Sequence, residues 1–95
     1  MLINKGISSG DVVSIKLVNG DELIARLDED NLMDVKVNRP LALTMAQGGL
    51  GMMPWMLLGN DDNVTLKKEH ILAMVISKKD AADQYTQGTT GIALR

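Results

Sequence analysis

The 95-residue chain contains no cysteine and no phenylalanine, and its only aromatic residues are Trp55 and Tyr85. The lack of cysteine excludes disulfide scaffolds, thiol catalysis and metal sites with cysteine ligands. A single histidine, His70, also excludes a metal site built from several histidines of one chain. Proteins that bind single strands without sequence preference generally need several aromatic side chains for base stacking. The scarcity of aromatic residues therefore disfavours OB-type and RRM-type nucleic-acid binding.

An excess of charge of one sign and long apolar runs are also missing. Lys and Arg together number 10 against 12 Asp and Glu, so the formal net charge is −2 and no general basic field attracts nucleic acid or a membrane. No apolar run approaches the roughly 18 residues of a membrane-spanning helix, and the first ten residues do not have the pattern of an export signal. With 45% hydrophobic residues, the chain is predicted to form one globular, cytoplasmic domain without a membrane partner.

Alternation of apolar and polar residues predicts a series of short antiparallel strands. Asn19-Gly20 separates the first two, and this dipeptide is favoured in tight hairpins because both residues tolerate positive φ. In the second strand, Ile24 is expected on the solvent face. Pro40 lacks an N–H group, which predicts a bulge or a sheet edge in the third strand. The continuous apolar run of the last strand indicates that both of its faces are covered. The expected strands are residues 11–18, 21–29, 33–43, 64–69 and 71–76.

Three segments fall outside this alternating pattern. Residues 45–62 contain glycines, Pro54 and an Asn-Asp-Asp-Asn turn signal, and are predicted to be an insertion. Residues 79–95 are rich in Asp, Gln, Thr and Gly, and are predicted to be a mobile tail. Residues 1–9 include a glycine and two serines, which allow one or two helical turns at most. The predicted domain therefore covers residues 1–78.

Residues 13–34 and 68–76 form two motifs, and both resemble motifs of the Sm and Sm-like (LSm) proteins. Ala25 stands where the family pattern has a second glycine, at a point where the strand bends sharply. Residues 68–76 resemble the second motif of bacterial Hfq, in which a Lys-His pair precedes an apolar strand. The insertion and the acidic balance are most similar to the diverged Sm-like proteins of marine phages, which would place the protein in the cytoplasm of the host cell. Four residues match the first family motif in register: Gly20, Leu27, Asp30 and Met33.

The resemblance implies an all-β fold, in which a short or missing N-terminal helix precedes five strongly bent antiparallel strands that form a small open barrel. It also implies a homo-oligomeric ring of about five to seven subunits, closed by pairing of the fourth strand of one subunit with the fifth strand of the next. An apolar strand with an unpaired edge agrees with such an assembly. The residues predicted at this interface, or at an interface with a protein partner, are Trp55, Met56, Leu66, Ile71, Met74 and Ile76.

The resemblance further implies a pocket for single-stranded RNA at the ring pore. The stacking position corresponds to Leu32, which has no π-face. The base-reading position corresponds to Asp34, whose carboxylate repels phosphates but accepts a hydrogen bond from a base N–H. Lys67, Lys68 and His70 correspond to cationic positions at the pore, where a ring repeats each charge and makes phosphate binding dependent on salt.

Each of these residues also has a structural interpretation, which the sequence leaves open. Asp30 and Asp34 are residues that fix turns through side-chain-to-backbone hydrogen bonds. A neutral His70 can hydrogen-bond within its own turn, and the two lysines can belong to a solvated strand face. Arg26 and Lys36 are expected to be solvated.

The segment from Met45 to Leu58 contains four of the seven methionines and the only tryptophan. Such side chains are enriched at interfaces, although a hairpin packed on its own barrel explains them equally well. Two functions therefore remain: an RNA-binding, RNA-chaperone-like ring, or a structural ring that has lost the nucleotide pocket and binds protein through this segment. We expect no enzymatic activity and no cofactor or metal. The carboxylates of residues 28–30 are typical of a solvated turn, and the glycines of residues 48–51 do not open a phosphate-binding helix.

Overall fold

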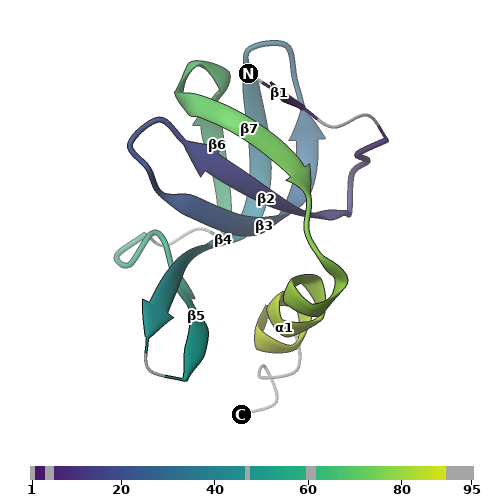
Figure 1. Ribbon diagram of the computed structural model, residues 1–95. Helices are drawn as coiled ribbons and strands as arrows, with labels where there is room; N and C mark the ends of the chain where they lie inside the picture. Colours follow the sequence, from purple (N-terminus) through teal and green to yellow (C-terminus); the bar gives the residue numbers. More distant parts are fainter. Residues whose placement is uncertain (1, 4–5, 47, 60–61, 90–95) are drawn as a thin grey trace.

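The computed structural model describes residues 2–3, 6–46, 48–59 and 62–89 (Figure 1). The described chain is all-β except for one 3₁₀ turn and one helix at its C-terminal end, and the predicted fold class is confirmed at this level. In chain order the elements are β1 (Leu2–Ile3), β2 (Val12–Leu17), β3 (Glu22–Asp30), β4 (Asp34–Ala46), β5 (Gly49–Pro54), β6 (Asn63–Lys67), the 3₁₀ turn η1 (Lys68–His70), β7 (Ile71–Ile76) and α1 (Lys79–Thr89).

The strands form one bent sheet that does not close into a full barrel. Its order is β1-β7-β2-β3-β4-β5, and β6 pairs with β4 as well. All pairs are antiparallel except β1 with β7. In Figure 1, β2, β3 and the first half of β4 curve around one side of the molecule, while the second half of β4 and β5 form a two-stranded ribbon beside α1. The predicted fourth strand, residues 64–69, corresponds to β6 and η1, whereas β5 lies within the predicted insertion, residues 45–62.

The hairpin between β2 and β3 forms where the sequence predicts it, but only Gly20 of the Asn19-Gly20 dipeptide has a positive φ. Gly20 has a φ of +97°, which favours glycine because a Cβ atom is disfavoured in this region. The Gly20 N–H donates to the Leu17 carbonyl oxygen at 2.9 Å. The Asn19 side-chain oxygen accepts from the Asp21 N–H at 3.0 Å, so the turn is held by its own polar residues.

A bulge divides β4 into two halves. Ala25 of β3 faces two residues of β4, Arg39 and Pro40, because the pairing register shifts at this position. Arg39 has a φ of +49°, in the left-handed region, and this conformation redirects the strand. The bulge predicted at Pro40 is confirmed.

The main core lies inside the curve of the sheet. It is formed by residues that alternate along β2, β3, β4, β6 and β7, and the predicted inward positions of β3 are all buried. Partly buried Trp55 and Val64 pack against its side. The buried members are Val13, Ile15, Leu17, Leu23, Ala25, Leu27, Val35, Val37, Leu66, Ile71 and Met74.

Helix α1 packs on the sheet and forms a second core with it. Its presence shows that two predictions are wrong. Residues 79–89 are helical and packed, so the predicted mobile tail is wrong for this part; residues 90–95 lie outside the described residues. Ile24 is fully buried with Val12 and Tyr85, so its predicted place on the solvent face is also wrong. The helix gives no clear signal in the sequence because it buries only one large side chain, Tyr85, next to small alanines. A single aromatic residue produces no clear helical period.

Where the sequence predicts a short or missing helix, residues Leu2–Ile3 form strand β1, in parallel register with Ala73 and Met74 of β7; residues 1, 4 and 5 lie outside the described residues. The prediction that the last strand is covered on both faces is wrong, because β7 is covered on one face only. Leu72 and Ile76 are exposed in the single chain, because α1 turns away and covers β2 and β3 instead.

Candidate functional site

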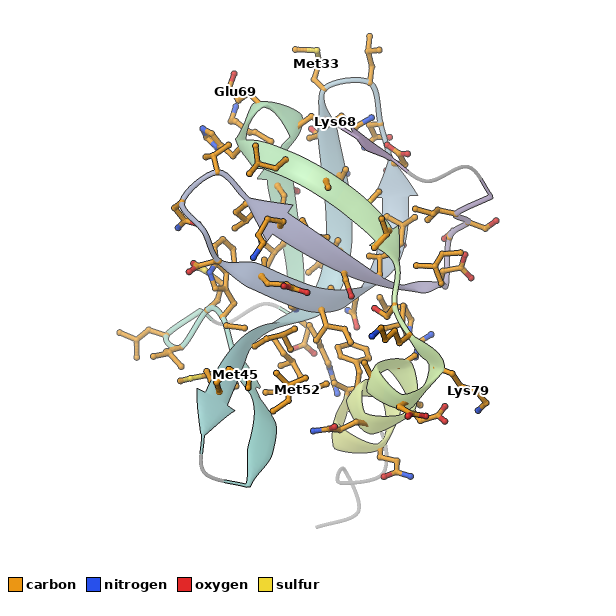
Figure 2. All side chains as sticks on the ribbon, in the orientation of Figure 1. Met33, Met45, Met52, Lys68, Glu69 and Lys79 are labelled. Atoms are coloured by element: carbon orange, nitrogen blue, oxygen red, sulfur yellow. The ribbon has the colours of Figure 1, made fainter. Side chains whose placement is uncertain are left out.

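The two loops expected to bind RNA lie side by side at one end of the sheet. The Lys68 N–H donates to the Met33 carbonyl oxygen at 3.0 Å, and Asp34 pairs with Lys67 in the ladder between β4 and β6. Figure 2 shows Met33 and Lys68 near each other at this end. The tip of the first loop leaves Leu32 88% exposed. Leu32 thus offers an apolar contact surface without a π-face.

Asp34 holds the loop in shape. Its carboxylate accepts a hydrogen bond from the Asn31 side-chain nitrogen at 2.9 Å, and its carbonyl oxygen accepts from the Asn31 N–H at 2.9 Å. These contacts fix the turn and engage one carboxylate oxygen, so Asp34 stabilises the turn through a side-chain partner instead of the expected backbone partner. An ionised carboxylate has about four acceptor sites on its two oxygens, so Asp34 retains the capacity to accept a hydrogen bond from a base N–H.

Lys68 is neutralised within the chain. Its Nζ lies 2.7 Å from Asp30 Oδ1, and the two side chains are only 22% and 37% exposed. This half-buried pair removes most of the attraction that a free ammonium group would have for a phosphate. Lys68 therefore binds phosphate well only if Asp30 releases it.

Lys67 is the ladder partner of Asp34, so these two side chains leave the sheet on the same face. Lys67 and His70 also face a groove that Leu32, Asp34 and Lys68 do not line. Both line this open groove of about 570 Å³ together with Trp55 and Met56. The His70 side chain is exposed, and its Nε2 lies 3.5 Å from Glu69 Oε2. Lys67 has no ion-pair partner in the part of the chain that the structure describes. Of the five predicted RNA-binding residues, Lys67 and His70 thus line this groove, and Lys67 also neighbours Asp34 of the loop contact.

Sequence reasoning did not predict this groove. It placed Trp55 in an interface loop, whereas the structure brings the indole next to the β2–β3 hairpin and to β6. The Trp55 N–H donates to the Pro40 carbonyl oxygen at 3.0 Å, and Trp55 Nε1 donates to Asp21 Oδ2 at 3.3 Å. These partners are far apart in the sequence, so no local pattern could have revealed them.

Three of the predicted interface side chains point into the core of their own chain. Leu66, Ile71 and Met74 are buried, so the prediction that they contact a partner is wrong for their side chains. The reason is strand alternation, which directs one face of β6 and β7 inward. Ile76 and Met56 are exposed and Trp55 is partly buried, so these three remain available to a partner.

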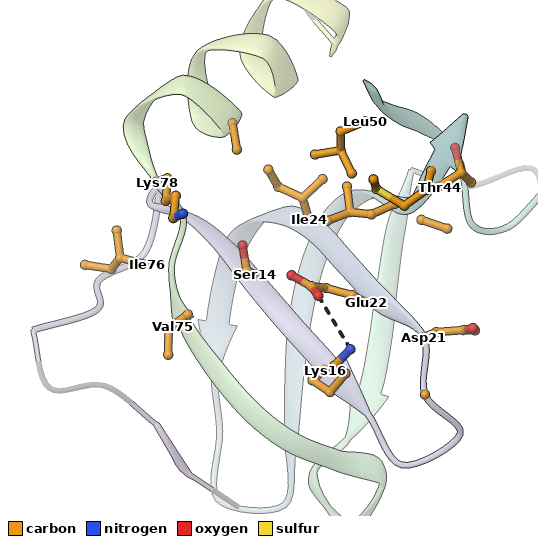
Figure 3. Close-up of a pocket in the computed structure, with 15 residues that line it drawn as sticks. Ser14, Lys16, Asp21, Glu22, Ile24, Thr44, Leu50, Val75, Ile76 and Lys78 are labelled. Carbon is orange, nitrogen blue, oxygen red and sulfur yellow. Dashed lines mark ion pairs between the residues drawn. The ribbon is translucent and has the colours of Figure 1, made fainter. Parts of the chain in front are cut away.

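A second hollow of about 580 Å³ lies on the outer face of the sheet, between α1 and the β4–β5 ribbon (Figure 3). Ile24 forms part of its floor, and Leu50 and Ile76 lie on its sides. At one margin, Lys16 Nζ lies 3.5 Å from Glu22 Oε1. The sequence could not predict this hollow because it depends on the position of α1.

No cluster of acidic residues and histidine suited to a metal ion occurs among the described residues. Among the same residues, no helix has the length and apolar character needed to cross a membrane. In comparisons with known proteins, the chain matches no protein-family model and no curated protein sequence.

Proposed function

We propose that the chain is an Sm-like subunit that assembles into a homo-oligomeric ring of about five to seven copies and binds short single-stranded RNA. The observation that carries this proposal is the contact between residues 31–34 and 67–70, the two loops that hold RNA in the family the sequence resembles. A ring repeats the cations of these loops, so a locally basic rim is compatible with a net charge of −2 per chain.

Unpaired strand edges support the assembly step. Within the described residues, β5 and β6 pair only with β4, so each has one edge with free backbone groups. Exposed Leu72, Val75 and Ile76 place apolar surface on β7, although β7 itself pairs with β2 on one side and with β1 at Ala73 and Met74 on the other. Unpaired edges such as those of β5 and β6 pair readily with other strands, and a head-to-tail pairing that closes on itself gives a ring.

Paired substitutions at the loop contact test RNA binding. Replacing Lys68 and His70 together with alanine is expected to weaken binding of fluorescently labelled oligo-U and oligo-A, measured by anisotropy at low salt. Replacing Asp30 with asparagine is expected to raise the affinity by about fivefold, because Lys68 loses its partner and a half-exposed ion pair contributes up to roughly 1 kcal/mol. Lys79→Ala, a change of an exposed lysine on α1, is the matched control and is expected to have no effect.

Native mass, measured by light scattering on the same samples, separates binding from assembly. The Lys68→Ala/His70→Ala protein is expected to keep the mass of the wild-type ring. A wild-type ring that binds neither oligonucleotide at low salt would refute the RNA-binding proposal. A wild-type monomer at micromolar concentration would refute the ring.

A second candidate function is a structural ring that binds protein. It is favoured by the apolar side chains that are exposed on the β4–β5 ribbon and on the segment that follows it. Exposed apolar side chains that gather in one region are typical of protein interaction sites. These side chains are Met45, Leu50, Met53, Met56, Leu57 and Leu58.

Charged substitutions on the ribbon test this second candidate. Leu50→Lys combined with Met53→Lys is expected to lower the native mass, or to abolish pull-down of a partner already identified with the wild-type ring, because charge disfavours burial in an apolar contact. Leu32→Lys is the matched control, since Leu32 is an exposed leucine on a loop remote from the ribbon. An unchanged mass and unchanged partner binding in the double variant would contradict this function.

A further inference from the structure

The groove beside β6 is lined by an aromatic side chain, Trp55, together with Lys67 and His70. The indole of Trp55 packs against the main core and also lines the groove, which has a volume of about 570 Å³. Volumes of about 300–1,000 Å³ are typical of sites that hold small organic ligands. The walls near Trp55 are apolar and include Val18 and Met56, both exposed to solvent.

Two hydrogen bonds fix the position of Trp55. Its backbone N–H donates to the carbonyl oxygen of Pro40, at the bulge of β4, at 3.0 Å. Its indole Nε1 donates to Asp21 Oδ2 at 3.3 Å, and this carboxylate also accepts from the Asn19 side chain at 3.2 Å. The indole is therefore held in place before any ligand arrives, which reduces the conformational entropy that binding would cost.

The cationic side of the groove is suited to an anion. Lys67 lines the groove and has no ion-pair partner among the described residues, and the exposed imidazole of His70 lies on the same side. Positively charged grooves with aromatic platforms are the usual way in which proteins bind single-stranded nucleic acid, because every base has a π-face and every phosphate a charge. A peptide would use the apolar walls but would leave Lys67 without a partner unless it carried an acidic residue.

We propose that this groove is a nucleotide subsite, in which one base of a single strand stacks on Trp55 while its phosphate contacts Lys67 and His70. This inference rests on the proposed RNA-binding function and places the base-stacking group outside the loop where Leu32 occupies the family's stacking position. The strand would run from the loop contact at Lys68 into the groove, since Lys67 and Lys68 are adjacent in the chain.

Intrinsic fluorescence tests stacking directly, because Trp55 is the only tryptophan in the chain. Titration of oligo-U or oligo-A into the wild-type protein at low salt is expected to quench its emission, with the same midpoint as the anisotropy of labelled oligonucleotide. Trp55→Leu is expected to weaken binding by roughly 5- to 150-fold, the range measured when a stacking side chain is removed. Trp55→Phe keeps a π-face and is expected to lose less.

The contact between Lys67 and a phosphate is tested by replacing exposed lysines, because these changes leave the core intact. Lys67→Ala is expected to weaken binding and to reduce the slope of log affinity against log salt by about 0.7 for each phosphate that the lysine neutralises in the wild-type protein. Lys78→Ala is the matched control, because Lys78 also lacks an ion-pair partner among the described residues but lines the other hollow. It is expected to retain wild-type affinity.

The outcomes separate this inference from the function on which it rests. Quenching together with weaker binding in Trp55→Leu and Lys67→Ala supports the subsite. RNA binding without quenching, and with wild-type affinity in Lys67→Ala, overturns the subsite and leaves the loop contact as the RNA site. No binding by the wild-type ring overturns both proposals. Because Trp55 packs on the core, Trp55→Leu is first checked by thermal unfolding; if it is unfolded, the quenching and Lys67→Ala results decide.

Discussion

Replacing Tyr85 with alanine is expected to lower the free energy of unfolding by about 3–5 kcal/mol, the usual range for removing a buried aromatic side chain. Tyr85 is 1% exposed and is the only large side chain that α1 inserts between Val12 and Ile24. Its loss leaves a cavity and separates the helix from the sheet. A domain of this size has a total stability of about 5–15 kcal/mol, so urea unfolding at fixed protein concentration will show the effect clearly.

Tyr85→Phe measures the contribution of the hydroxyl group alone to the free energy of unfolding. The Tyr85 hydroxyl donates to the Asn38 carbonyl oxygen at 2.7 Å and accepts from the Arg26 N–H at 3.2 Å. Phenylalanine keeps the ring but leaves both backbone groups without this partner, at a cost of about 1–3 kcal/mol. A loss of less than about 1 kcal/mol in Tyr85→Ala would show that α1 contributes little to the fold.

The wild-type and Tyr85→Phe proteins should also differ at alkaline pH. Burial raises the pKa of Tyr85 above the usual value of 10.0, and the hydrogen bond from Arg26 opposes this shift only in part. The unfolded chain therefore releases this proton at a lower pH than the folded chain. The neutral hydroxyl makes its full contribution to the free energy of unfolding below about pH 9. This contribution falls as the pH rises through and above 10. Tyr85→Phe is expected to lack this alkaline loss, which urea unfolding between pH 8 and 11 will measure.

Met74→Ala is expected to lower the free energy of unfolding by about 2–5 kcal/mol, because Met74 is fully buried in the main core. It lies on β7 between β1 and β2, where a cavity cannot easily collapse. The sequence motif instead places Met74 at an interface with another subunit. A large loss of stability in Met74→Ala would show that the side chain belongs to the core of its own chain.

Leu72→Ala is the matched control for Met74→Ala. Leu72 is on the same strand but is 54% exposed, and a change there is expected to alter the stability of the folded chain by less than about 0.5 kcal/mol. The unfolding of both variants is measured with denaturant, and their native mass by light scattering. If Met74→Ala failed to assemble while the stability of the chain remained unchanged, its assignment to the core would be wrong.

Local patterns in the sequence predicted the local features of the fold. Alternation located the main strands, Asn19-Gly20 located a hairpin, and Pro40 located the bulge. Each of these depends on the conformational preferences of a few neighbouring residues. The same patterns could not reveal α1. The Tyr85 hydroxyl forms its hydrogen bonds with backbone groups of Arg26, Asn38 and Arg39, which precede it by 46 to 59 positions in the chain.

Prediction of the site was limited by the same dependence on distant contacts. The motifs brought residues 31–34 and 67–70 together, since each loop has its own recognisable spacing. They could not show that Asp30 neutralises Lys68, or that Lys67 and His70 share a groove with Trp55. Both facts depend on which side of a strand each side chain leaves and on how residues 55–62 return to the sheet.

The bulge of β4 also constrains the order in which the chain can fold. The carbonyl oxygens of Asn38 and Arg39, which receive the Tyr85 hydroxyl, have this arrangement only after β3 and β4 have paired. An isolated helix of 11 residues is marginal in water, so α1 gains most of its stability when it docks. We therefore expect helix docking to be a late event in folding, after the sheet has formed the bulge of β4 to which the Tyr85 hydroxyl donates its hydrogen bond.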